Sequence, residues 1–170
     1  MLSVLQRLLD QPREQATLEF KSNWDLADDI GEYVSALSNA AALNGHDRAW
    51  MVWGVDDATK VIKSTTFDPF TQKVKTDKPG SNQQLIMWLQ FMTQPRADFQ
   101  FHEVTHPDGP VVLLEIHPAR SAPVAYKQVR YIRIDSNKVK LSDHSDKEAR
   151  LWALLGSKDD WTGEVVPGAT

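Results

Sequence analysis

Residues 49–55 read AWMVWGV, an unbroken apolar run. Strands that are covered on both faces have this continuous pattern, whereas strands with one face in water alternate apolar and polar residues. The run is far shorter than the roughly 20 apolar residues of a membrane-spanning helix. We therefore expect residues 49–55 to form the central strand of a sheet, and we place the other elements around it.

Helical periodicity predicts helices before and after this strand. The longest is expected over residues 25–43, where apolar residues recur every three or four positions. Its apolar stripe consists of Leu26, Ile30, Val34, Leu37 and Ala41. Asn44 and Gly45 should end this helix, because both residues tolerate a left-handed backbone. Shorter helices are expected from Leu2 up to Pro12, from Leu85 up to Pro95, and over 145–155.

Further strands are expected over residues 16–20, 99–105, 111–117 and 131–134. The sequence HPDG at 106–109 suits a tight turn, so the second and third of these should pair as a hairpin. Alternation in the last strand predicts that Ile132 and Ile134 point inward, and that Tyr131 and Arg133 point outward. The pattern defines an α/β (α+β) fold with a mixed central sheet flanked by helices.

The chain has 170 residues, which suits one core, so we expect a single domain over 1–155. Residues 156–170 are expected to be a linker to a C-terminal region that the given sequence does not include. The chain has no cysteine, which excludes disulfides, zinc-thiolate sites and thiol catalysis and favours a cytoplasmic location. The tryptophans mostly lie on apolar stripes, so we expect them in the core, with Trp24 and Trp161 as the two candidates for the surface.

Charge is distributed unevenly along the chain, whose formal net charge is −4. The segment 118–141 has a local balance of +5, because a single acid, Asp135, lies among six basic residues. These are Arg120, Lys127, Arg130, Arg133, Lys138 and Lys140. A basic segment of this kind either forms a solvated face or contacts phosphates, and the charge pattern alone favours neither.

Acidic residues before and after the first two strands form a second candidate site. Glu14 and Glu19 lie five positions apart, a spacing that places them on one face of neither a strand nor a helix, so they meet only if the chain bends. Together with Asp56 they have the oxygen ligands that Mg²⁺ or Mn²⁺ prefers, and Lys21 lies close by in sequence. The alternative is structural: a turn at Glu14, an exposed Glu19–Lys21 pair, and an ordinary turn at Asp56.

Four sequence motifs, in order, resemble the Schlafen AlbA-like domain, a divergent Alba-type family. They are LEFK at 18–21, ALSNAA at 36–41, WGVDD at 53–57 and PVAYKQVRYIRIDS at 123–136. The resemblance implies an α/β module of bacterial or archaeal regulators that binds nucleic acid, often followed by an ATPase-like or winged-helix region. Related animal domains have endoribonuclease activity that uses three acids. By this resemblance, Glu14, Glu19 and Asp56 of the present chain would correspond to those acids, with Lys21 beside them.

The sequence departs from the family at two places. A glycine pair that usually precedes the central strand is missing, although Asn39 is retained, and Asp135 replaces a usual glycine. The first difference leaves open whether that turn contacts phosphates. The second places an acid inside the basic segment.

Three functional hypotheses follow. The first is a DNA- or RNA-binding module of a transcriptional-regulator-like protein, in which basic residues contact phosphates and Tyr131 stacks on a base. The basic residues are Lys127, Arg130, Arg133, Lys138 and Lys140. The second is a Mg²⁺- or Mn²⁺-dependent endoribonuclease with Glu14, Glu19 and Asp56 as metal ligands and Lys21 as a further catalytic residue. The third is a regulatory or interaction domain, with a homodimer as one arrangement.

Overall fold

The computed structural model describes residues 1–11, 15–75 and 82–168, with side chains described as far as residue 156. Its helices are α1 (Leu2–Leu9), α2 (Ala27–Asn44), α3 (Leu85–Met92), the short 3-10 helix η1 (Leu141–Asp143) and α4 (Ser145–Gly168). Its strands are β1 (Leu18–Lys21), β2 (Ala49–Trp53), β3 (Thr93–Gln94), β4 (Phe99–His106), β5 (Gly109–Ile116), β6 (Ala125–Tyr126), β7 (Val129–Ile134) and β8 (Asn137–Lys140). This mixture confirms the predicted α+β class.

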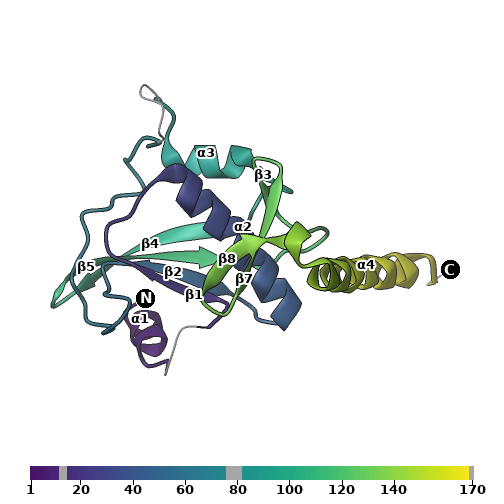
Figure 1. The fold of residues 1–170 in the computed structure, drawn as a ribbon, viewed down its shortest axis with the longest axis horizontal. Helices are drawn as coiled ribbons and strands as arrows, with labels where there is room; N and C mark the ends of the chain where they lie inside the picture. Colours follow the sequence, from purple (N-terminus) through teal and green to yellow (C-terminus); the bar gives the residue numbers. More distant parts are fainter. Residues whose placement is uncertain (12–14, 76–81, 169–170) are drawn as a thin grey trace.

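Strand β2 lies inside a four-stranded sheet with the order β1-β2-β5-β4 (Figure 1). It runs parallel to β1 and antiparallel to β5, and β5 forms the predicted hairpin with β4. Trp50 and Val52 face one hydrophobic cluster, and Met51 and Trp53 face another on the opposite side. All residues of β2 are buried, so the prediction of an inner strand covered on both faces is confirmed.

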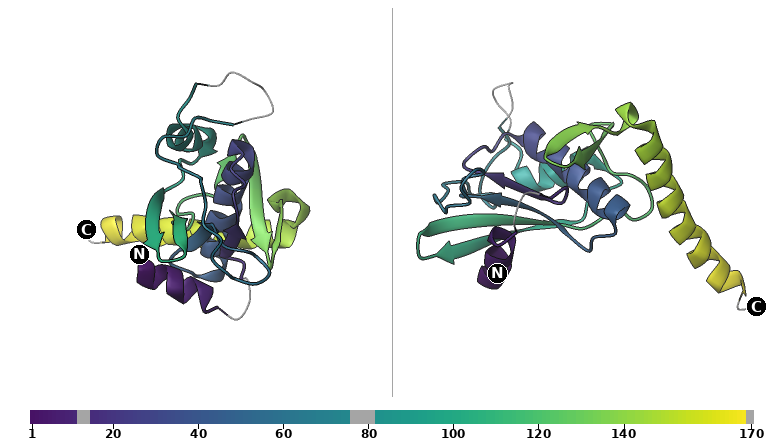
Figure 2. Two further views of the ribbon diagram at one scale, coloured as in Figure 1. Left: turned by 90° about the vertical axis from the view of Figure 1, so that its left-hand side faces the viewer. Right: turned by 60° about the horizontal axis from the view of Figure 1, so that its bottom comes forward.

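The two faces of this sheet are covered by different helices. Leu5 and Leu8 of the amphipathic helix α1 cover one face, where they join the cluster that contains Phe20 and Trp50. Helix α2 covers the other face with residues of the predicted stripe, and it ends at Gly45, whose φ of 71° is left-handed as expected. Figure 2 shows α1 at the margin of the molecule and α2 in its middle.

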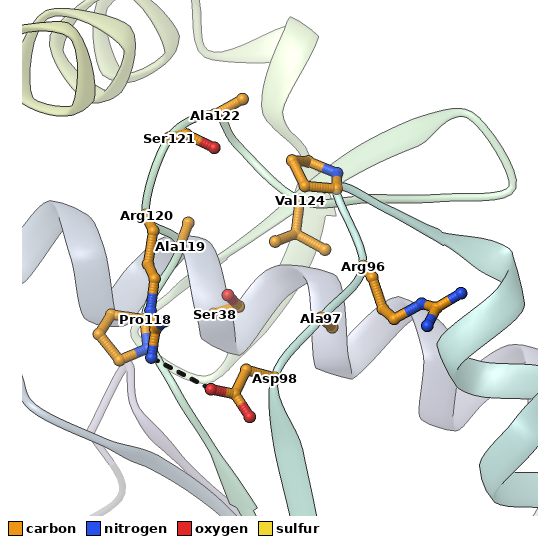
Figure 3. Close-up of a pocket in the computed structure, with 11 residues that line it drawn as sticks. Ser38, Arg96, Ala97, Asp98, Pro118, Ala119, Arg120, Ser121, Ala122 and Val124 are labelled. Atoms are coloured by element: carbon orange, nitrogen blue, oxygen red, sulfur yellow. Dashed lines mark hydrogen bonds and ion pairs between the residues drawn. The ribbon is translucent and has the colours of Figure 1, made fainter. Parts of the chain in front are cut away.

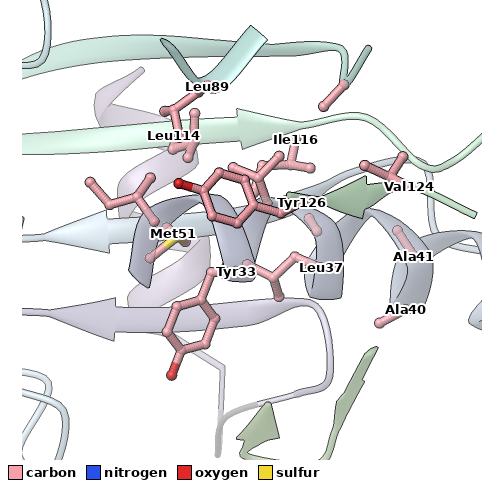
Figure 4. Packing of buried hydrophobic residues seen from close by; sticks show 14 of the residues in the cluster. Tyr33, Leu37, Ala40, Ala41, Met51, Leu89, Leu114, Ile116, Val124 and Tyr126 are labelled. Carbon is pink, nitrogen blue, oxygen red and sulfur yellow. The ribbon is translucent and has the colours of Figure 1, made fainter. Parts of the chain in front are cut away.

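Helix α2 is enclosed because a second sheet, with the order β3-β6-β7-β8, packs on its outer side. Figure 4 shows the core that results, in which Tyr126 of the second sheet lies near Leu37 of α2 and Leu114 of the first sheet. The Tyr126 ring passes so close to Gly31 that a Cβ atom there would lie 2.1 Å from it. Glycine is therefore required at position 31 for the second sheet to approach the helix.

Polar side chains of α2 attach the second sheet to the helix. The Asn39 amide donates to the carbonyl oxygens of Val124 and Tyr131, at 2.9 and 2.8 Å, and its oxygen accepts from the Val124 N–H at 2.8 Å. Ser35 donates to the same Val124 carbonyl and accepts from the Tyr131 N–H. Buried polar groups require such partners, so Asn39 in the motif ALSNAA fixes the position of the segment 124–131.

The structure differs from the sequence-based expectations in three places. The predicted strand at 131–134 is part of a whole second sheet. Arg133, which alternation placed outward, is buried, because β7 also faces β1 and the guanidinium donates to the Leu18 carbonyl oxygen. Helix α4 begins at Ser145 and continues to Gly168, past the predicted end at residue 155, and it extends away from the sheets (Figures 1 and 2). Within the described ranges, no helix is long and apolar enough to span a membrane.

Candidate functional site

Glu19 lies on β1 and points away from α1, into the space between the two sheets. Its side chain is 8% exposed, and an oxygen lies 2.9 Å from the Arg133 guanidinium. Lys21 is the second cation near this carboxylate, at 3.9 Å, and it also lies 3.8 Å from Asp29. Burial raises the pKa of Glu19, an effect that the positive charges of Arg133 and Lys21 partly offset. Glu19 and Lys21 are therefore not an exposed cross-strand pair.

The two aspartates after β2 have different surroundings. Asp56 accepts hydrogen bonds from the N–H groups of Ala58 and Thr59 and from the Thr59 hydroxyl. The bond from the Thr59 N–H contributes most to lowering the pKa of Asp56, whose carboxylate stabilises its own turn. Asp57 is close enough for its negative charge to raise the pKa of Glu19. Of these two aspartates, Asp57 is therefore the one whose charge raises the pKa of Glu19.

The predicted acidic site cannot be assembled from the described part of the chain. Glu14 lies outside the described residues. In the ranges that are described, no group of three histidine or acidic residues is placed to hold a metal ion. We therefore derive no reaction step through Mg²⁺ or Mn²⁺, and metal binding by Glu14, Glu19 and Asp56 stays a prediction.

The basic segment faces the acids of α2 and β1, and three of its six cations form ion pairs there. Lys127 lies 2.8 Å from Asp28. Lys138 lies 2.9 Å from Asp29 and 3.0 Å from Glu32. Burial lowers the pKa of Lys138, but the hydrogen bonds to these two carboxylates and their negative charges outweigh it, so the pKa is raised. With Arg133 held by Glu19, three of the cations predicted to contact phosphates are instead in ion pairs between the second sheet and the rest of the fold.

Two of the predicted cations keep an exposed position without an acidic partner among the described residues. Lys140 is exposed at the end of β8. Arg130 is exposed on β7, and its guanidinium lies 5.2 Å from the centre of the Trp152 ring. Trp152 on α4 is itself 41% exposed, although its apolar stripe had predicted a core position. Tyr131 is partly buried: its backbone forms hydrogen bonds with Asn39 and Ser35 of α2, and its side chain packs against the core cluster.

Arg130 also lines a surface hollow of about 360 Å³ between β6 and the loop that follows β3. The other residues of its lining are Gln94, Pro95, Ala122, Pro123, Ala125 and Gln128. A cation, an exposed indole and a hollow thus meet on one face, formed by β3, β6, β7 and α4. Sequence analysis selected Arg130 through charge but missed Trp152, because only the direction in which α4 leaves the second sheet exposes that ring.

The fold and this arrangement define a class of protein: an α+β domain in which one helix is enclosed by two sheets and joined to the outer sheet by ion pairs. The family described as Schlafen, AlbA_2 matches residues 14–142. The chain therefore belongs to the Schlafen AlbA_2 family, which confirms the resemblance seen in the four sequence motifs.

Comparison with individual proteins adds little to this assignment. No curated protein matches the sequence. Among solved structures, the DIP2311 protein from Corynebacterium diphtheriae is similar, with a TM-score of 0.49 and 13% sequence identity. The match covers 82% of this chain and 26% of that chain, so this chain spans about a quarter of the length of DIP2311. A likeness of this degree carries no argument about function.

Proposed function

We propose that this chain is a nucleic-acid-binding module of a bacterial or archaeal regulator. Its membership of the Schlafen AlbA_2 family supports this proposal, since domains of that family are associated with nucleic-acid-binding or regulatory roles. The observation that carries it is the Arg130–Trp152 pair, an exposed cation on an exposed indole beside a hollow. Arginine neutralises phosphate, and an indole stacks on a base of any identity.

The small number of cations available to phosphate determines the affinity and the salt dependence that we expect of this binding. Because Arg133 and Lys138 are held in ion pairs inside the fold, the electrostatic contribution comes from few contacts, among them Arg130, Lys140 and Lys127, whose ion pair with Asp28 is exposed. Each phosphate contact on a single strand adds about 0.7 to the slope of log K against log salt. Binding should therefore be weak, should decrease with salt at a shallow slope, and should depend little on base sequence.

Fluorescence anisotropy with labelled oligonucleotides tests the proposal. Arg130→Gln should weaken binding about fivefold at roughly 0.1 M salt, the effect of one phosphate contact. Trp152→Ala should cost about 1 to 3 kcal/mol of binding free energy through lost stacking, whereas Trp152→Phe should retain most of it. Arg7→Gln is the matched control, because Arg7 is exposed on α1 and α1 covers the far face of the first sheet. Equal affinities for all four variants and the parent chain would refute the proposal.

The two other hypotheses from the sequence give different outcomes in the same samples. Metal-dependent RNA cleavage would appear on a denaturing gel as fragments formed with Mn²⁺ and lost with EDTA. If Glu14 and Glu19 carry it, the Glu14→Ala/Glu19→Ala variant should leave the RNA intact. A regulatory or interaction domain would bind neither RNA nor DNA at any salt concentration.

A further inference from the structure

The hollow beside Arg130 is one of three that follow each other along the same edge of the molecule. It shares Pro95 and Ala122 with a hollow of about 160 Å³ formed by the loops after β3 and β5. At its other end it shares Gln94 and Gln128 with a hollow of about 400 Å³ between α3 and the β6–β7 turn. Shared lining residues place the three hollows next to one another in a row, which we name the edge groove.

Cations occur along the whole edge groove. Arg96 and Arg120 line the first hollow, Arg130 the middle one and Lys127 the last. Asp98 is the one acid among the described residues that line it. The spacing of positive charge along a groove is what an extended polyanion requires, since each phosphate then meets a cation as the backbone passes.

In the first hollow, one of these cations forms an ion pair with Asp98. Figure 3 shows the Arg120 side chain reaching to Asp98 on the rim, and the guanidinium lies 3.1 Å from that carboxylate. His117 is also near Asp98, at 3.5 Å. Arg96 extends from the opposite side of the hollow and points away from Asp98 (Figure 3). Because Asp98 is more than half exposed, this ion pair is weak and can exchange for a phosphate.

Exposed aromatic rings flank the groove. Phe91, at the last hollow, is 78% exposed on the outer side of α3, and Trp152 lies beneath Arg130. A ring face stacks on a base only if that base is unpaired, because the bases of a duplex already stack on each other. The combination of a groove with cations and two exposed rings therefore suits a single strand and not a double helix.

We propose that a single-stranded nucleic acid lies along the edge groove, from Arg96 and Arg120 past Arg130 to Lys127 and Phe91. This inference rests on the proposed function and adds to it the form of the nucleic acid and the surface it occupies. Two residues of the groove, Arg96 and Phe91, were not selected by any sequence pattern. RNA and DNA share the chemistry that the groove recognises, so both belong in the test.

The test compares labelled single strands of about 4 to 16 nucleotides, as RNA and as DNA, with duplexes of the same sequence. At least one single strand should bind more tightly than its duplex. Arg96→Gln and Arg120→Gln should each weaken single-strand binding about fivefold at roughly 0.1 M salt. Arg7→Gln again serves as the matched control.

A variant with the opposite expected effect strengthens the test. Asp98→Asn removes the acid of the first hollow and releases Arg120, so affinity should rise about two- to fivefold. Asp108→Asn makes the same change of charge at the β4–β5 turn, the other end of the hairpin from Asp98, and should leave affinity unchanged.

The possible results separate the two proposals. If no oligonucleotide binds the parent chain, the proposed function fails and the groove proposal fails with it. If Arg130→Gln weakens binding while Arg96→Gln, Arg120→Gln and Asp98→Asn behave like their controls, nucleic-acid binding stands and the groove is overturned. Duplexes that bind as tightly as single strands would also overturn it.

Discussion

The buried Glu19–Arg133 ion pair should be the most sensitive point of the fold. The Arg133 side chain is 0% exposed, and its guanidinium lies 2.9 Å from Glu19. At that distance the attraction is on the order of 6 kcal/mol for an effective dielectric constant of about 20, before desolvation is subtracted. Removing one partner leaves the other charge buried without its nearest counter-ion, which costs about 3 to 5 kcal/mol. Arg133→Met and Glu19→Met should each lose about this much free energy of unfolding.

The double variant distinguishes this explanation from a simple loss of packing. Two methionines replace the charges with apolar groups of similar size, so Glu19→Met/Arg133→Met should be within about 1 kcal/mol of the parent chain. Urea unfolding monitored by tryptophan fluorescence measures all four proteins, because Trp53 is fully buried. If the two single losses simply add in the double variant, the ion pair is not the cause and the reasoning is refuted.

The pH dependence of Arg133→Met gives an independent check. Burial already raises the pKa of Glu19 above its ordinary value of 4.5, and Arg133 is the main group that opposes this. Without Arg133 the folded chain binds the Glu19 proton still more tightly than the unfolded chain does. Stability then increases as pH falls toward 4.5. The difference in free energy of unfolding between the parent chain and Arg133→Met should therefore become smaller as the pH is lowered from about 7 to about 5.

Three further predictions concern the attachment of the second sheet. Asn39→Ala leaves buried backbone groups of Val124 and Tyr131 without partners and should cost about 3 kcal/mol of unfolding free energy in urea, whereas Asn44→Ala on the same helix should cost far less. Gly31→Ala places a Cβ atom 2.1 Å from the Tyr126 ring and should lower the free energy of unfolding in urea by about 1 to 3 kcal/mol. In the control Gly156→Ala, the added Cβ meets nothing within 4 Å, so the chain should not be destabilised. Burial and the hydrogen bond to Asp28 raise the pKa of the Tyr126 hydroxyl above its ordinary value of 10.0. The stability that this group contributes is therefore complete below pH 10.0 and is lost as the pH rises above that value. In thermal unfolding above this pH, the melting temperature of the parent chain should fall more steeply with pH than that of Tyr126→Phe.

The first sheet and its helices could be predicted because their signals are local. The run at 49–55, the stripe on α2 and the HPDG turn each depend on periodicity or turn chemistry within a short window. The second sheet could not be predicted in the same way. Its strands β3 and β6 are only two residues long, and the segment 124–131 that contains β6 is held by Asn39 and Ser35, which lie far away in sequence. Strands this short show no alternation.

The candidate site was only partly predictable for a related reason. Residue types identified the basic segment, and the motifs identified the family. The partners of each charge could not be predicted, since Lys138 meets Asp29 and Arg133 meets Glu19 through contacts between distant segments. Exposure, which decides whether a cation can reach a phosphate, depends on those partners.

The sequence by itself determined the α+β class, the buried central strand, the hairpin, the long helix and the family, because these follow from local patterns and short motifs. Only the tertiary structure decided which charges are internal and which face water. Folding places the basic segment against the acids of α2 and β1, so half of its cations take part in the contact between layers. What remains outside, Arg130 on Trp152 and the cations of the edge groove, is a property of the surface that the packed layers leave exposed.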